Sequence, residues 1–172
     1  MRVCALPAIA CCAFALAIAM PGDAAETPRE VHGSADAYAA PGVALAWGVL
    51  RGASETATVV VVRVITDPQE YPWFAVTGVD PFSKGEQPLL RATQSAGPRD
   101  VRVPRAQFAD YPRTELRFFA SAAAAQSGTP KLVVFYLGVP DTTPELVDEA
   151  KLDVYLADRI ARARAAIGSK AP

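Results

Sequence analysis

The run from Thr56 to Ile65, TATVVVVRVI, constrains the fold of this chain more than any other segment. β-Branched residues dominate it, and they favour extended backbone because their side chains pack well on a pleated sheet. The run is also too apolar for one of its faces to meet water along its whole length. We therefore expect a strand in the centre of a sheet.

Other short apolar runs are bounded by Gly, Pro, Asp or Ser and predict further strands. From Gly42 to Val49, large apolar residues alternate with small or neutral ones, as a half-buried strand requires. The remaining runs span 71–79, 87–92, 100–103, 114–120 and 131–137. Between two of them, residues 104–111 predict one or two helical turns.

About seven short strands at roughly regular spacing are typical of a β-sandwich. We therefore predict a mainly β protein in which residues 41–141 form an Ig-like antiparallel β-sandwich. Tyr111, just before a late strand, resembles the tyrosine corner of Ig-like domains, although its spacing is not diagnostic.

The pattern changes to a helical period near the C-terminus. Apolar residues recur there at steps of three and four: Leu152, Tyr155, Leu156, Ile160, Ala163 and Ile167. Thr143 and Pro144 resemble an N-cap and a first helical residue, and Gly168 marks the end. We predict a C-terminal amphipathic α-helix in a helical segment, 142–168, that packs on the sandwich and precedes a tail, 169–172. The alternative is that its apolar side fits a partner's groove.

Residues 1–24 are predicted to be a cleavable secretory signal peptide. Arg2 precedes an apolar run that extends to Met20, which is the order of charge and hydrophobicity that export requires. Small residues favour cleavage after Ala24. Residues 25–40 are small, polar and interrupted by Pro and Gly, so we predict a flexible leader there. The chain is expected to be exported, to the periplasm or, as the alternative, secreted.

Two other interpretations of the N-terminus stay open. An uncleaved segment would anchor the chain, although an apolar run of about 18 residues interrupted by Pro7 is at the short limit for a membrane span. A lipoprotein would instead use Cys11 or Cys12. All three cysteines lie within residues 1–24, so the cleaved chain has neither a thiol nor a disulfide. After cleavage we expect no stable membrane span.

The composition argues against several classes of site. His32 is the only histidine and lies in the predicted leader, so neither a Ser-His pair nor an ordinary zinc or copper site is expected. A formal net charge of −1 argues against nucleic acid or an anionic membrane held by bulk charge. Nucleotide-binding and nucleophile-elbow motifs do not occur in the sequence. We predict no catalytic residue, no metal and no cofactor.

Acidic residues allow two weaker hypotheses. Calcium or magnesium could be bound by loop acids, namely Asp67, Glu70, Asp80 and Glu86, but their spacing does not match a calcium loop. Asp80 with Asp110 or Glu115 could form the carboxylate pair of a glycoside hydrolase, a choice made by elimination only.

Aromatic residues are the more informative feature for binding. Tyr71, Trp73 and Phe74 cluster near Phe82, and a second group holds Tyr111, Phe118 and Phe119. Inward rings would be core, whereas outward rings or rings at loop tips would mark a binding patch. If a patch exists, its predicted binding residues are Trp73, Phe82 and Tyr71.

These features together predict an exported, non-catalytic binding or protein-interaction module. Its partner would be another envelope protein or a small ligand, and the sequence leaves its oligomeric state open. The alternatives are an accessory subunit of a cell-envelope assembly and, with less support, a carboxylate-dependent hydrolase.

Overall fold

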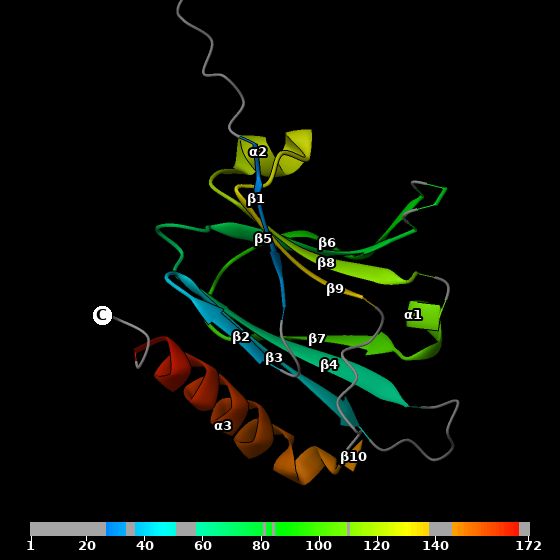
Figure 1. Cartoon of the computed structure of the whole chain (residues 1–172), viewed down its shortest axis with the longest axis vertical. Coiled ribbons are helices and arrows are strands. Elements are labelled where there is room, and N and C mark those ends of the chain that lie inside the picture. The colour runs from blue at the N-terminus through cyan, green and yellow to red at the C-terminus, as the bar shows by residue number, and fades with distance from the viewer. Residues whose placement is uncertain are drawn as a thin grey trace, which may run out of the picture.

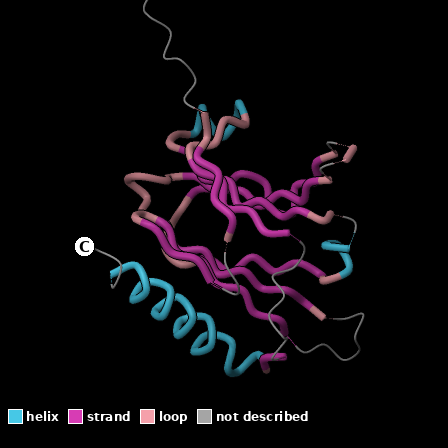
Figure 2. Tube along the Cα trace, viewed as in Figure 1, coloured by secondary structure: helices cyan, strands magenta, loops and turns pink. Residues whose placement is uncertain are grey.

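The computed structural model describes residues 27–33, 37–50, 58–80, 82–83, 85–109, 111–137 and 146–168. The predicted signal peptide, the predicted tail and the predicted helix-capping residues Thr143 and Pro144 lie outside these ranges. Two five-stranded sheets face each other, and a long helix lies along the outer side of one of them (Figures 1 and 2). The predicted mainly β class with a C-terminal helix is therefore confirmed, but the sheets hold more strands than the seven or so predicted.

The first sheet has the order β1-β9-β8-β5-β6. Its strands are β1 (Arg29–His32), β9 (Leu132–Leu137), β8 (Arg113–Phe119), β5 (Trp73–Val79) and β6 (Glu86–Gln94). Neighbouring strands are antiparallel except β1 and β9, which are parallel.

The second sheet has the order β10-β3-β4-β7, with β2 beside β3. Its strands are β10 (Leu146–Val147), β3 (Val43–Leu50), β4 (Val59–Thr66), β7 (Arg99–Pro104) and β2 (Ala37–Ala40). The β-branched run over residues 59–65 lies in β4, which pairs with β3 on one side and β7 on the other. Its central position agrees with the prediction.

The main core lies between the two sheets. β3 and β4 contribute alternate residues to it, among them Leu45, Trp47 and Val62, each at most 1% exposed. The first sheet contributes its inward residues, including Phe74 and Phe118. This alternation is the expected consequence of the two-residue period of a strand.

The predicted flexible leader, 25–40, instead contains two strands. Arg29–His32 pairs in parallel with β9, and Ala37–Ala40 pairs with β3. Val31 and Tyr38 pack against the main core, so the segment buries apolar surface and satisfies its backbone at two sheet edges. Its polar composition does not predict these contacts, because they are made with strands that are distant in the sequence.

Helix α3 (Glu149–Gly168) covers the outer face of the second sheet and builds a second core there. Leu152, Leu156 and Ile160 lie on its buried side. The helix begins several residues later than predicted, because Leu146–Val147 pairs with β3 as a strand. No helix in the described ranges is both long and apolar enough to cross a membrane.

β3 is buried on both faces, not on one as its alternation predicted. Its small residues Ala44 and Ala46 face α3 in the second core. A Cβ at Gly48 would lie 3.2 Å from side-chain carbons of both Leu152 and Leu156. The helix packs on these small residues, and their size sets how closely it approaches the sheet.

Two short helices complete the described fold. α1 (Ala106–Ala109) falls within the helical turns predicted over 104–111. α2 (Ala122–Ser127) lies in the connection between β8 and β9, where Ser121 caps its first turn and Gly128 ends it with φ 70°.

Candidate functional site

The three predicted binding residues do not come together. Tyr71 is 6% exposed, and its ring packs edge-on against Phe118 with centroids 5.8 Å apart. Trp73 begins β5 and is partly exposed. Phe82 is 92% exposed in the turn beyond the other end of that strand. Of the second aromatic group, Phe118 and Phe119 are core.

Tyr71 lines a pocket at one end of the two sheets, which we call the end pocket. Its volume is about 670 Å³, within the range of roughly 300–1,000 Å³ that small-molecule sites occupy. Three segments form it: the β4–β5 loop, the α2-containing β8–β9 connection, and the chain entering β1. Sequence reasoning missed this pocket because its walls lie in three separate parts of the chain.

The walls of the end pocket combine apolar and polar groups. Its apolar part is made by Ala120, Ala124, Pro130 and Leu132, and its hydroxyls come from Thr27, Thr129 and Tyr71. Arg29 and Lys131 supply positive charge, and Glu70 is the one acid among the described residues that line it.

Electrostatic contacts tie these charges to Tyr71. Lys131 Nζ lies 3.6 Å from Glu70 Oε1 and 5.3 Å from the centre of the Tyr71 ring. Burial raises the pKa of the Tyr71 hydroxyl, its hydrogen bond with Glu70 raises the pKa further, and the charge of Arg29 opposes both. At neutral pH the hydroxyl is therefore a neutral hydrogen-bond donor.

A row of ion pairs crosses the outer face of the first sheet. Glu115 forms an ion pair with Arg113, whose Nε lies 2.6 Å from one carboxylate oxygen, and its other oxygen accepts a hydrogen bond from Arg117 Nε at 2.8 Å. Arg117 continues to Glu86 on β6 through two hydrogen bonds, and Arg113 reaches Glu30 on β1 at 3.2 Å. The row spans the sheet from edge to edge and neutralises most of its own charge.

Of the carboxylates proposed for hydrolysis, Asp80 and Glu115 lie in the described residues, and each has hydrogen-bond or ion-pair partners. Hydrogen bonds from the Ser83 hydroxyl and the Phe82 amide lower the pKa of Asp80. Both oxygens of Glu115 already hold a guanidinium group. Asp110 lies outside the described residues.

The loop acids proposed for metal binding also have other partners. Glu70 lies beside Lys131, Glu86 binds Arg117, and Asp67 accepts a hydrogen bond from the Gln69 amide. Within the described ranges, no three His, Cys, Asp or Glu side chains gather as metal ligands would. His32 lies on β1 with its ring 5.1 Å from that of Phe135.

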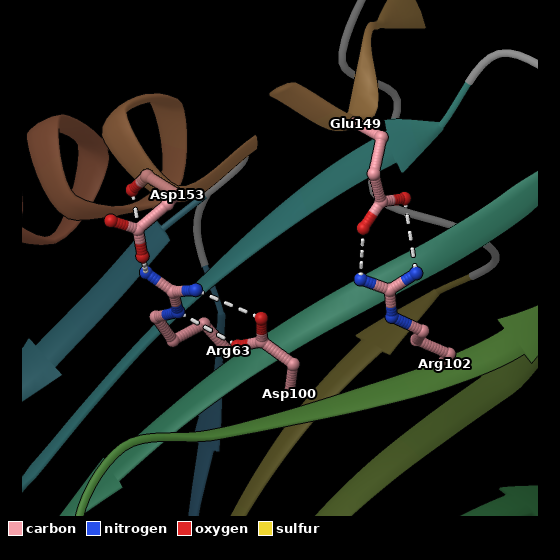
Figure 3. A network of polar contacts seen from close by, with 5 residues as sticks. All are labelled: Arg63, Asp100, Arg102, Glu149 and Asp153. Carbon is pink, nitrogen blue, oxygen red and sulfur yellow. Dashed lines mark hydrogen bonds and ion pairs between the residues drawn. The ribbon is translucent and has the colours of Figure 1, made fainter. Parts of the chain in front are cut away.

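A second polar network joins α3 to the second sheet (Figure 3). Arg63 on β4 binds both oxygens of Asp100 at 2.7 and 2.8 Å and reaches Asp153 on α3 at 2.6 Å. Arg102 binds Glu149 at the start of the helix. Asp100 and Asp153 raise the pKa of Arg63, which is 13% exposed at its side chain. These contacts position the helix and leave no free group for chemistry in the pictured network.

Comparison of the chain with protein-family models, with curated proteins and with solved structures finds no match. The end pocket is the concave feature that combines apolar walls, charge and a predicted binding residue.

Proposed function

We propose that this protein is an exported, non-catalytic binding module of Ig-like architecture that holds its ligand at the end pocket. One observation carries the proposal. Loops that connect strands of the two sheets meet at one end and enclose a pocket of about 670 Å³, with Tyr71 in its wall. A cavity of this size with a few convergent polar groups is a typical binding site.

The strand connections support the Ig-like part of the proposal. β4 pairs with β7 in one sheet, while β5, β8 and β9 lie together in the other. In an Ig domain, strands B and E share one sheet and strands C, F and G share the other, in the same chain order. The molecule departs from that pattern at its edges, where β1 and β10 pair in parallel, and by the helix on its outer face.

The position of the pocket supports binding. With β4, β5, β8 and β9 as strands B, C, F and G, the pocket lies between the B–C and F–G loops. Those loops contact the ligand in Ig variable domains, and loops on a rigid scaffold commonly carry function. Architecture alone does not name a ligand, because one fold serves many functions.

Residues 1–24 support export, with the periplasm as the destination. The partner is then either a small ligand or a protein of the envelope. A binding module would hold a small molecule, whereas an accessory subunit would hold a whole protein, so the mass of the bound partner distinguishes the two. Both alternatives can be tested in one experiment.

The test places a photoreactive amino acid at Thr129, an exposed residue of the pocket wall, in the tagged full-length protein in living cells. Gln107 on α1, also exposed and outside the pocket lining, is the matched control. We expect a defined mass increment after irradiation from Thr129 and not from Gln107. A small increment supports ligand binding, and a protein-sized increment supports an accessory subunit. Equal products from both positions, or none from Thr129, would contradict the proposal.

A further inference from the structure

Two cationic residues from neighbouring segments of backbone line the end pocket. β1 and β9 are parallel neighbours, with Arg29 in register with Leu132, and the Arg29 amide donates to the Lys131 carbonyl at 3.1 Å. The backbone therefore fixes both residues at the same corner of the first sheet. Each of their side chains lines the pocket.

Among the residues that the structure describes, these positive charges are only partly compensated. Arg29 makes no ion pair with any other residue that the structure describes. Lys131 lies 3.6 Å from Glu70, with their side chains 48% and 36% exposed. An exposed pair of this kind is weak. Two cations thus face one acid across the described lining.

Hydroxyl groups share the pocket lining with these cations. The hydroxyls of Thr27, Thr129 and Tyr71 line the same pocket. A guanidinium group matches the two oxygens of a carboxylate or phosphate, and an ammonium group binds either as a point charge. Ala120, Ala124 and Leu132 supply apolar surface to the same lining, which suits a short hydrocarbon.

We infer that the end pocket binds a small ligand that joins an anionic oxygen group, carboxylate or phosphate, to a short apolar body. Arg29 and Lys131 hold the anion, and the alanine-rich wall holds the body. The inference rests on the proposed function and adds the chemical class of its ligand.

The first test uses three probes with the same hydrocarbon tail: hexanoate, hexyl phosphate and hexanamide. Each is titrated into the isotope-labelled full-length chain while the amide resonances of residues 69–72 and 129–132 are followed. We expect hexanoate, hexyl phosphate or both to shift these resonances saturably, and hexanamide to bind at least tenfold more weakly. Which anion binds more tightly distinguishes a carboxylate ligand from a phosphate ligand.

The second test replaces each charged side chain by glutamine, which is polar, uncharged and shorter. Arg29→Gln and Lys131→Gln are each expected to weaken anion binding about tenfold or more, since a charge-assisted hydrogen bond contributes at least that factor. Arg105→Gln and Lys151→Gln are the matched controls, because both residues are exposed and lie outside the pocket lining. The controls should bind as the unchanged chain does, and all four variants should keep its melting temperature.

The two proposals fail in different ways. If hexanamide shifts the pocket resonances as strongly as hexanoate, the anion inference is wrong and the binding pocket stands. If no probe binds while the photoreactive residue at Thr129 still captures a ligand, the inference is again wrong and the proposed function survives. If Arg105→Gln weakens anion binding as much as Arg29→Gln, the affinity depends on the net charge of the protein and not on the pocket. The assigned site is then wrong.

Discussion

At the scale of single residues, side chains of the same type have very different roles in this molecule. The chain has two tryptophans, and the sequence singled out Trp73 because it lies in an aromatic cluster. The structure places Trp47 in the main core at 1% exposure, with its ring 5.0 Å from that of Tyr136, and leaves Trp73 partly exposed. Clustering along the chain does not reveal burial, because adjacent residues of a strand face opposite sides.

The two tryptophans therefore give a paired prediction. Trp47→Ala should lower the free energy of unfolding by about 3–5 kcal/mol, the usual cost of deleting a buried aromatic ring. Trp73→Ala should cost clearly less, because part of its ring already meets water. Urea denaturation followed by circular dichroism measures both changes. Equal losses for the two variants would show that Trp73 is as much a core residue as Trp47.

At the scale of elements, each predicted strand run overlaps a strand of the structure, whereas the pairings between strands far apart in the chain could not be predicted. β-Branched runs identify strands because the signal is local. The alternation in β3 predicts that its small residues face solvent, yet Ala44, Ala46 and Gly48 lie beneath α3. A small residue that faces water and one that admits a helix look identical in sequence.

The polar contacts and the pocket also depend on residues far apart in the chain, so local patterns do not predict them. Arg63 reaches Asp100 and Asp153 across 37 and 90 residues of chain, and no local pattern predicts such a separation. Tyr71 was predicted as a binding residue, but its pocket neighbours Arg29 and Lys131 were not. Arg29 lies in the segment 25–40, whose composition predicts a flexible leader, and only its pairing with β9 brings it to Lys131.

The contribution of α3 packing to stability can be tested directly. Leu156 is fully buried against the second sheet, whereas Val154 on the same helix is 72% exposed. Leu156→Ala should destabilise the fold by about 2–5 kcal/mol. Val154→Ala should change stability by less than about 0.5 kcal/mol. Thermal and urea unfolding of both variants check this. If Leu156→Ala is as mild as Val154→Ala, the helix contributes little to the folded state and is not firmly docked.

At the scale of the whole molecule, two layers of packing share one central sheet. The second sheet has the main core on one side and the α3 core on the other. The first sheet has the main core on its inner side and carries its row of ion pairs on the outside. We therefore expect the sheets to unfold together, because neither can keep its buried face without the other.

This shared core makes stability sensitive to alkaline pH. The Tyr136 hydroxyl lies in the main core, and burial raises the pKa of Tyr136 well above its ordinary value of 10.0. Burial likewise raises the pKa values of Tyr38 and Tyr71. A buried tyrosine must stay neutral in the folded state, while the unfolded chain releases its proton near pH 10. The resulting stabilisation is complete below pH 10 and is lost as the pH rises further.

Tyr136→Phe tests whether Tyr136 accounts for most of the loss of stability above pH 10. The free energy of unfolding, measured in urea between pH 8 and 11.5, should fall less steeply above pH 10 in this variant than in the unchanged chain. Tyr38 and Tyr71 should preserve a smaller decline. Between pH 6 and 8 the two proteins should show parallel behaviour, since no tyrosine titrates there. Identical slopes above pH 10 would mean that the Tyr136 hydroxyl reaches solvent in the folded state, and that the main core is open at β9.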